Sequence, residues 1–457
     1  MVMKKSNQSM ITGPLFSNII SFTIPVILTS VLQLLFNAAD LVVVGRFRGS
    51  LSVGAVGATG SLTALIVNLF IGLSVGAGVS VAHGIGGKMD KDVHQTVHTA
   101  IPASIICGII LTVVGVFVSE PLLVMMDTPT EILKLSARYM KIYFCGITFT
   151  VVYNFAAAIL RAAGDSKSPL IFLTIAGVIN VILNVFFVLA FGMDVEGVAL
   201  ATSISQAVSA VLVVIALMRR KDACRLELRK MKIYWRQLGK IVRIGLPAGI
   251  QASLFAISNV IIQSSVNSFG DVVVSGNAAA GNIEGFLFVT MNSFHQTAVN
   301  FCGQNSGAKR YDRVKKTLLI CLACVGVLGV SLGAAFYLLA RPLLGIYITD
   351  SAEAIMYGVL RMSIISTTYV ICGLMDVVTG ALRGMGASLV PMLISVLGVC
   401  GIRLGWIFTF FQLPQFHSLP GLFLSYPISW GITFAVNLTA FLVIYRKRKA
   451  TLAVQPA

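Results

Sequence analysis

The feature that most constrains this chain is a series of long apolar runs that carry almost no charge. Each run is long enough to form the helix of about 20 residues that crosses the hydrocarbon core of a bilayer. Only 11% of the 457 residues are charged, whereas a typical globular domain has about 25%. The runs are continuous and do not alternate, which favours helices over a membrane β-barrel. The sequence therefore predicts an all-α integral membrane protein.

We count twelve such runs, separated by Gly, Pro and charged residues. Their centres lie near residues 30, 68, 107, 149, 179, 207, 254, 292, 327, 369, 399 and 433. The connections between the runs are short, so no separate soluble domain is expected. The apolar run after Phe16 is long enough to be a true span, and we do not interpret it as a cleavable signal sequence.

The net charge of +17 is concentrated in alternate loops between the runs. Lys4 and Lys5 precede the first run, "RRKDACRLELRKMKIYWR" follows the sixth, and "YRKRK" follows the last. By the positive-inside rule these segments are cytoplasmic, which predicts a multi-pass protein of the cell (plasma) membrane with both termini in the cytoplasm. The same distribution accounts for the positive charge without nucleic acid as a partner.

The chain matches itself when it is displaced by 222 residues. "IPVILTS" falls on "LPAGIQA", which pairs Pro25 with Pro247, and "AILRAAGDSKSP" falls on "GALRGMGASLVP". This duplication predicts an amino-terminal lobe of six spans over residues 1–218, a basic cytoplasmic linker over 219–237 and a carboxy-terminal lobe of six spans over 238–457. Such repeats are typical of secondary transporters that work by alternating access.

Asp40 is a carboxylate inside the first apolar run. Gln33, Asn37 and Asp40 are spaced i, i+4 and i+7, so a helix places them on one face. A charged group at the bilayer centre costs roughly 2.5–3.5 kcal/mol on insertion scales. Asp40 is therefore expected to carry a proton or to bind a cation. The alternative is an ion pair with Arg46 or Arg48 at the outer end of the span.

Two asparagines and a threonine are candidates to join Asp40. Asn180 and Asn184 share one face of the fifth run, and Thr202 lies in the sixth. Together with Asp40 they predict a cation-coupling cluster for H⁺ or Na⁺, because both prefer hard oxygen ligands. Asp40, Asn180 and Asn184 are the candidate Na⁺ ligands. Alternatively, each asparagine forms only a hydrogen bond between helices.

The second half does not repeat the carboxylate of Asp40, because isoleucine stands at position 262. It carries Asp376 instead, which the duplication pairs with Asn154. We therefore expect ion coupling in the first lobe and a substrate path that includes the second. Glu284, which we place at the opening of the eighth span, is expected to be solvated. The candidate residues of the substrate path are Gln33, Asn37, Asn154, Asn259, Gln263, Asn292 and Asp376.

Enzymatic chemistry finds little support in the sequence. His94 and His98 are four residues apart, but neither a third metal ligand nor the glutamate of an HExxH motif accompanies them. The nucleotide-binding pattern GxxxxGK[ST] is missing as well. We therefore expect a protein that is not an enzyme and that needs no cofactor besides the coupling ion.

The motifs "NAADLVVVGRF", "AILRAAGDSKSP", "GVINVILN", "GVALAT" and "GALRGMGAS" closely resemble the multidrug and toxic compound extrusion (MATE) family. The resemblance covers essentially the whole chain. It implies a V-shaped pair of six-helix lobes, expected as a monomer, that exports organic cations and other amphipathic compounds in exchange for Na⁺ or H⁺. It also implies that Asp40 is the essential aspartate, that Pro25 is the bending hinge, and that Asn180, Asn184 and Thr202 form the polar site.

The chain departs from the family at two positions. One branch has an acid where Asn184 stands, and another has a glutamate where Phe255 stands. The second departure argues against a carboxy-lobe cation site like that of the latter branch. A flippase of lipid-linked or polysaccharide precursors is an alternative function, and a membrane receptor or channel is a third.

Overall fold

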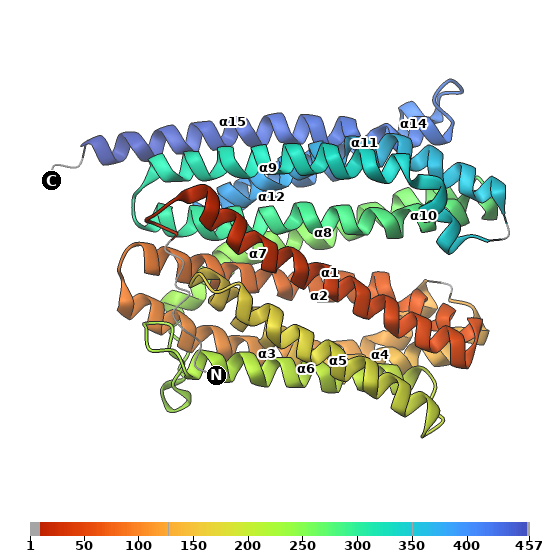
Figure 1. The fold of residues 1–457 in the computed structure, drawn as a ribbon, viewed down its shortest axis with the longest axis horizontal. Coiled ribbons are helices and arrows are strands. Elements are labelled where there is room, and N and C mark those ends of the chain that lie inside the picture. The colour runs from red at the N-terminus through yellow and green to blue at the C-terminus, as the bar shows by residue number, and fades with distance from the viewer. Residues whose placement is uncertain (1–9, 127, 350, 455–457) are drawn as a thin grey trace. The chain divides into compact units, whose positions relative to one another are not determined.

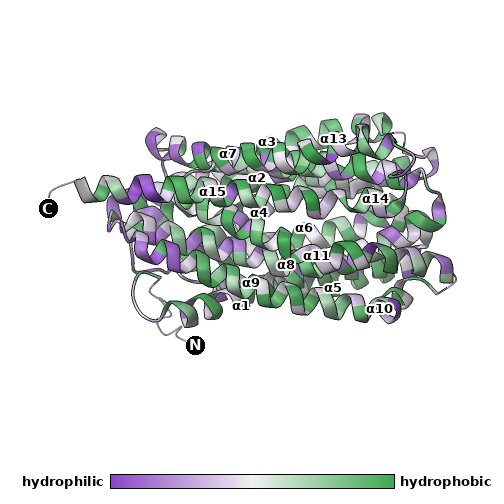
Figure 2. Ribbon diagram, turned by 90° about the horizontal axis from the view of Figure 1, so that it is seen from above, coloured by the Kyte–Doolittle hydropathy of each residue, from purple (hydrophilic) through white to green (hydrophobic). Residues whose placement is uncertain are grey.

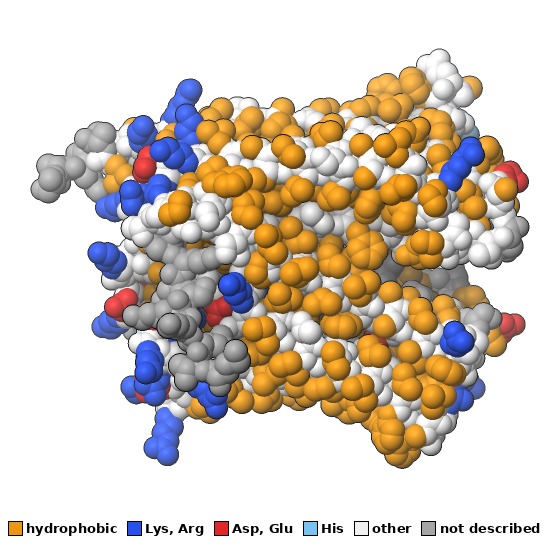
Figure 3. All heavy atoms as spheres, viewed as in Figure 1, with side chains coloured by type: hydrophobic (Ala, Val, Ile, Leu, Met, Phe, Trp, Pro, Cys, Tyr) orange, Lys and Arg blue, Asp and Glu red, His pale blue; other side chains and the backbone are white. Residues whose placement is uncertain are grey.

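The computed structural model describes residues 10–126, 128–349 and 351–454, and within these ranges its regular elements are all helices (Figure 1). Twelve helical segments are long and apolar enough to cross a membrane, so the predicted all-α, twelve-span fold is confirmed. Lys4 and Lys5, which entered the orientation argument, lie outside the described residues. Apolar residues occupy the middle of the helices and hydrophilic ones their ends (Figure 2). Hydrophobic side chains cover the long helices, whereas Lys and Arg gather near helix ends (Figure 3).

The described residues group into two compact units. Unit 1 contains residues 24–253, and unit 2 contains residues 10–23 and 254–457. Helix α1 (Leu15–Arg48) therefore begins in unit 2 and ends in unit 1, whereas α7 (Trp235–Asn267) begins in unit 1 and ends in unit 2. Compared with the lobes predicted from the duplication, residues 15–23 of α1 belong to unit 2, and residues 235–253 of α7 belong to unit 1.

Unit 1 is organised around one central helix, α4. This helix packs against α2, α3 and α6, and buries Phe144 and Phe155 almost completely. Pairs of long apolar helices leave few polar groups to satisfy, so shape and side-chain volume govern this packing. The complete helices of unit 1 are α2 (Ser50–Gly86), α3 (Asp90–Met125), α4 (Thr130–Ala162), α5 (Lys167–Leu189) and α6 (Val195–Met218).

Unit 2 repeats this plan around α11, which packs against α8, α9 and α15. Both bounds of α11 lie 222 residues after those of α4, so the helices reproduce the displacement found in the sequence. The complete elements of unit 2 are α8 (Asp271–Gly307), α9 (Tyr311–Leu338), α10 (Ala340–Tyr347), α11 (Ala352–Gly384), α12 (Leu389–Ser395), the π-helical turn η2 (Val396–Gly401), α13 (Ile402–Phe408), η3 (Phe410–Gln412), α14 (Leu419–Phe423) and α15 (Ser425–Val454).

The basic segment between α6 and α7 is hydrogen-bonded to the first turns of α3. It contains one short helix, η1 (Leu228–Lys230). The backbone N–H of Glu227 donates to His98 Nε2 at 3.0 Å, and the N–H of Tyr234 donates to Thr99 Oγ1 at 3.0 Å. An ion pair with Lys230 holds the pKa of the Glu227 carboxyl below its ordinary value. The segment is therefore a folded part of unit 1.

Helices α2 and α7 approach each other through glycines in unit 1. Gly72 and Gly76 of α2 lie against Gly245 and Gly249 of α7, and each helix spaces its pair four residues apart. A Cβ atom at Gly245 would lie 2.6 Å from Leu73 Cα and 2.9 Å from the carbonyl oxygen of Gly72. These distances are too short for any side chain, so the small residues allow direct backbone contact.

We therefore expect Gly245→Ala to lower the thermal unfolding midpoint of the purified protein, because overpacking of this kind costs about 1–3 kcal/mol. Gly239→Ala on the same helix is the matched control, because a Cβ there meets no atom within 4 Å. Alanine also has a higher helix propensity than glycine, so the control is expected to melt at the same temperature or higher. Equal midpoints for the two variants would refute the close packing of α2 and α7.

Candidate functional site

The carboxylate of Asp40 lies at the centre of a polar cluster in unit 1. Its side chain is buried, and Asn184 Nδ2 donates to Asp40 Oδ1 at 2.5 Å. Thr202 Oγ1 donates to Asp40 Oδ2 at 3.2 Å. Asn180 connects these partners, because its Nδ2 donates to Thr202 Oγ1 at 3.3 Å and its Oδ1 accepts from Asn184 Nδ2 at 3.2 Å. The structure thus brings together the four residues that the sequence analysis grouped for cation coupling.

The helices place these side chains for simple geometric reasons. Asn180 and Asn184 are one helical turn apart on α5, so both amides face the same neighbour. Glycine at position 177 lets Phe36 of α1 pack directly on α5, which draws the two helices together one turn from Asn180. The close approach of α1 allows Asp40 to reach the Asn184 amide.

The cluster has an unused acceptor of the kind that a cation needs. Asn184 Oδ1 is buried and has no hydrogen-bond partner among the described residues. It lies in the same side chain that binds Asp40, so a proton, a water or a cation there would have both a charged and a neutral oxygen ligand. The described residues contain no group of three or more His, Cys, Asp and Glu side chains that could hold a metal ion. One carboxylate among neutral oxygens balances a single positive charge, which suits H⁺ or Na⁺ better than a divalent ion.

The alternative pairing of Asp40 with an arginine is not what the structure shows. Arg48 Nη2 donates to the carbonyl oxygen of Val188 at 2.7 Å, and Arg46 is exposed. The partners of Asp40 are an amide and a hydroxyl, which carry no charge. Asp40 therefore has no positively charged side chain within ion-pair distance among the described residues.

The residues predicted for the substrate path do not form one cluster. Gln33, Asn37 and Asn259 are exposed, although Gln33 and Asn37 share the α1 stripe that leads to the buried Asp40. Asn154 Nδ2 donates to the carbonyl oxygen of Thr150 at 2.8 Å. Asn292 accepts from Gln296, four residues later on α8, at 3.4 Å.

Asp376 lies beside a buried histidine and arginine in unit 2. His295 Nδ1 is 2.7 Å from the carbonyl oxygen of Asp376, and Arg383 Nη1 is 3.3 Å from His295 Nε2. A histidine that donates through Nδ1 offers Nε2 as an acceptor to the guanidinium, so this imidazole is neutral. Asp376 and Arg383 also interact electrostatically, since seven residues, about two helical turns, separate them on α11.

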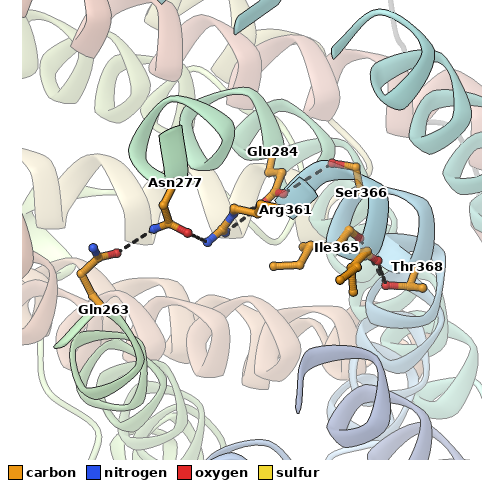
Figure 4. Close-up of polar contacts among 8 residues, drawn as sticks. Gln263, Asn277, Glu284, Arg361, Ile365, Ser366 and Thr368 are labelled. Carbon is orange, nitrogen blue, oxygen red and sulfur yellow. Dashed lines mark hydrogen bonds and ion pairs between the residues drawn. The ribbon is translucent and has the colours of Figure 1, made fainter. Parts of the chain in front are cut away.

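Glu284 is not the solvated residue that the sequence analysis expected. It is 3% exposed, and Arg361 Nη2 and Nε donate to its Oε2 at 2.7 and 3.1 Å. Arg361 Nη1 donates to Asn277 Oδ1 at 2.6 Å, and Asn277 Nδ2 donates to Gln263 Oε1 at 3.0 Å. Figure 4 shows this chain of contacts, which runs from α7 through α8 to α11. The expectation was wrong because α8 is 37 residues long, so a residue that seemed to open the span lies well inside the helix.

Two arginines of unit 2 were not predicted from the sequence: Arg361, whose side chain is 12% exposed, and the buried Arg403. Both lie in apolar runs that the hydropathy pattern had already assigned as spans. An intramembrane arginine is itself a signal of function or of a buried partner. Applied to the arginines as it was to Asp40, that rule would have found both.

Comparison with known proteins places this architecture among membrane transporters. A family model described as MatE matches residues 25–186 and again residues 247–408. Both bounds of the second match lie 222 residues after those of the first, which is the displacement of the duplication. The two matches together cover more than half of the chain.

Two relatives from Bacillus subtilis (strain 168) match most of the chain. The probable multidrug resistance protein YpnP is 27% identical over 392 residues, with 86% of this chain and 87% of the relative covered. The probable multidrug resistance protein YoeA is 24% identical over 442 residues, with 95% of both chains covered. The chain is also similar to a solved structure of a multidrug resistance MATE family transporter of the MOP superfamily in an outward-facing conformation. The two are 19% identical with a TM-score of 0.89, and the match covers 98% of this chain and 100% of the transporter chain.

The pairing of Glu284 with Arg361 predicts strong coupling between the two side chains. Removing one member of a buried ion pair costs about 3–5 kcal/mol, because it leaves the other charge uncompensated. We expect Glu284→Gln and Arg361→Gln each to lower the free energy of unfolding in detergent by about this amount, and the double variant to lose much less than the sum of the two.

The pair Glu120–Lys141 provides the matched control, since its nitrogen and oxygen are 2.7 Å apart but the two side chains are 56% and 43% exposed. The corresponding double-mutant cycle is expected to show a much smaller coupling. Additive effects at Glu284 and Arg361 would rule out the buried ion pair.

Proposed function

The chain belongs to the multidrug and toxic compound extrusion family of membrane transporters, and from this premise we propose that it exports organic cations and drug-like amphipathic compounds in exchange for H⁺ or Na⁺. The observation that carries this proposal is the Asp40 cluster, in which a buried carboxylate is held by an amide and a hydroxyl. A carboxylate without a fixed positive partner favours binding of a mobile one. We place the protein in the cell membrane with both termini in the cytoplasm, and we expect it to act as a monomer.

Loading of Asp40 changes its hydrogen bonds in a way that involves two helices. A proton on Oδ1 turns this oxygen from an acceptor into a donor, so it no longer accepts from Asn184 Nδ2. Rotation of the Asn184 amide then presents Oδ1, the acceptor that has no partner, to the new O–H. The same rotation removes the 3.2 Å bond from Asn184 Nδ2 to Asn180 Oδ1. Protonation therefore rearranges the contact between α1 and α5.

The same oxygens fit Na⁺. Asp40 supplies the single negative charge, and Asn180 Oδ1 and Asn184 Oδ1 are neutral hard ligands on one helix face. A bound Na⁺ would supply the positive charge that the proton supplies otherwise. Either ion stabilises the conformation in which the charge of Asp40 is balanced. Bound substrate stabilises the other conformation.

We further propose that Pro25 is the hinge through which α1 responds. Proline has no N–H, so it removes one backbone hydrogen bond of the helix and favours a bend. Pro25 is buried and lies two residues after Thr23, the last residue of the amino-terminal segment of unit 2. The weak point of α1 thus lies where the helix passes from one unit to the other.

Asp40→Asn should abolish gradient-driven export, because an asparagine side chain is neutral and needs no cation. The measurement is efflux of a fluorescent organic cation from proteoliposomes under an imposed Na⁺ gradient and, separately, an imposed H⁺ gradient. Efflux by the wild-type protein under only one of them identifies the coupling ion.

Asp222→Asn is the control for this measurement. Asp222 lies in the segment between α6 and α7 and pairs with Arg220 at 2.5 Å, away from the membrane-spanning helices. Its variant is expected to transport at the wild-type rate. Full gradient-driven efflux by Asp40→Asn would contradict the coupling role, and no gradient-driven efflux of any cation by the wild-type protein would favour the lipid flippase.

Pro25→Ala should restore the missing backbone hydrogen bond and stiffen α1. We expect a lower maximal rate of efflux at saturating substrate, with equilibrium substrate binding within about twofold of the wild-type value, since a hinge affects conformational exchange. Stopped-flow efflux and equilibrium dye binding measure these two quantities. An unchanged maximal rate would exclude Pro25 as the hinge.

A further inference from the structure

Arg403 of α13 is a buried guanidinium that has no acidic partner of its own. Its side chain is 4% exposed, and its Nε donates to Ser429 Oγ at 3.0 Å. Its Cζ lies 4.1 Å from the ring centroid of Tyr426 and 5.4 Å from that of Trp430. No carboxylate of the described residues lies within ion-pair distance of it.

The carboxylates inside unit 2 are engaged with other arginines. Glu284 forms its ion pair with Arg361, and Asp376 interacts electrostatically with Arg383. Arg361 also lies near the aromatic ring beside Arg403, because its Cζ is 6.0 Å from the centroid of Tyr426. The guanidinium groups of Arg361 and Arg403 therefore both lie near Tyr426. In the cluster of these three residues and Glu284, the carboxylate of Glu284 is paired with Arg361. The cluster carries an excess of one positive charge.

An excess charge inside a membrane-spanning helix is costly unless something balances it. Aromatic faces compensate only part of this cost, since a cation–π contact contributes far less than a buried ion pair loses. An anionic group delivered from outside would supply the missing charge. Asp40 is a buried carboxylate that lacks a positive partner, and Arg403 is a buried cation that lacks a negative one among the described residues.

The local backbone also departs from regular helix at this point. The π-helical turn η2 (Val396–Gly401) directly precedes α13, so Arg403 stands two residues after it. Single π-helical turns are rare and are frequently found at functional sites. The turn changes the angular position of every later side chain on the helix, which fixes the face on which Arg403 projects.

We infer that Arg403, together with Tyr426 and Trp430, is a subsite for the carboxylate of the transported compound. The inference rests on the proposed export function and narrows its substrates to aromatic amphipathic molecules that carry a carboxylate beside their cationic group. The two terminal Nη groups pair with a carboxylate end-on, and this leaves the bond from Nε to Ser429 intact. The partly exposed ring of Tyr426 offers a face for the aromatic part of the compound.

Two dyes with the same rings test this subsite. Rhodamine B carries a free benzoate and a cationic xanthene, and its ethyl ester has the same cation without the carboxylate. Binding of each dye to the purified full-length protein in nanodiscs is measured by fluorescence polarisation, with no ion gradient. We expect the wild-type protein to bind the acid more tightly than the ester, by about tenfold or more, as for a hydrogen bond between charged groups.

Arg403→Gln should remove this preference by weakening binding of the acid, with the affinity for the ester within about twofold of its wild-type value. Arg403→Lys keeps the charge but lacks the planar fork, and is expected to retain part of the preference. Arg341→Gln is the matched control, since Arg341 is an exposed arginine of α10 in the same unit; its variant should bind both dyes as the wild-type protein does.

Three results would overturn the inference. They are equal affinity of the wild-type protein for acid and ester, an unchanged acid affinity in Arg403→Gln, and an equal loss of both dyes in that variant, which would indicate a structural role. The first of these needs no variant, so it does not depend on the folding of Arg403→Gln. Because the assay is at equilibrium, a failure here is separate from a failure of ion coupling, which the efflux assay with Asp40→Asn measures.

Discussion

A carboxylate without a fixed counter-charge, Asp40, is the constraint on which the rest of unit 1 depends. Its two oxygens accept from an amide and a hydroxyl, so they are solvated by dipoles but not neutralised. In a medium of low dielectric, an ionised carboxylate with only neutral partners is costly, which is why we propose that it binds a positive ion. On the proposed function, the packing of α1 on α5 then depends on whether this oxygen-lined site is occupied.

The two units use buried charge in different ways, although they derive from one duplicated plan. In unit 1, Asp40 has neutral partners, the Asn184 amide and the Thr202 hydroxyl, and no cationic partner among the described residues. In unit 2, the carboxylate of Glu284 forms an ion pair with Arg361, a side chain of the same protein. On the proposed function, the exchangeable ion site lies in unit 1, whereas the ion pair of Glu284 and Arg361 in unit 2 stabilises the fold.

Hydropathy and self-similarity were sufficient to predict the twelve helices, because both depend on patterns that extend over tens of residues. The grouping of Asp40 with Asn180 and Asn184 followed from helical spacing, which determines the face on which a side chain lies. Depth along a helix was the weaker prediction. Helices of 33–37 residues exceed the length that spans a bilayer, so Glu284 could not be placed by counting from a loop. Contacts between helices, such as that of Arg361 with Glu284, depend on rotations that one sequence does not specify.

The division of α1 and α7 between the units has a consequence for the two halves of the duplicated sequence. Each half of the duplicated sequence begins with a helix whose first part belongs to the compact unit of the other half. Residues 1–218 alone therefore lack the part of α7 that belongs to unit 1, and residues 238–457 alone lack the part of α1 that belongs to unit 2. Neither half of the duplicated sequence contains a complete compact unit, so each half needs the first helix of the other.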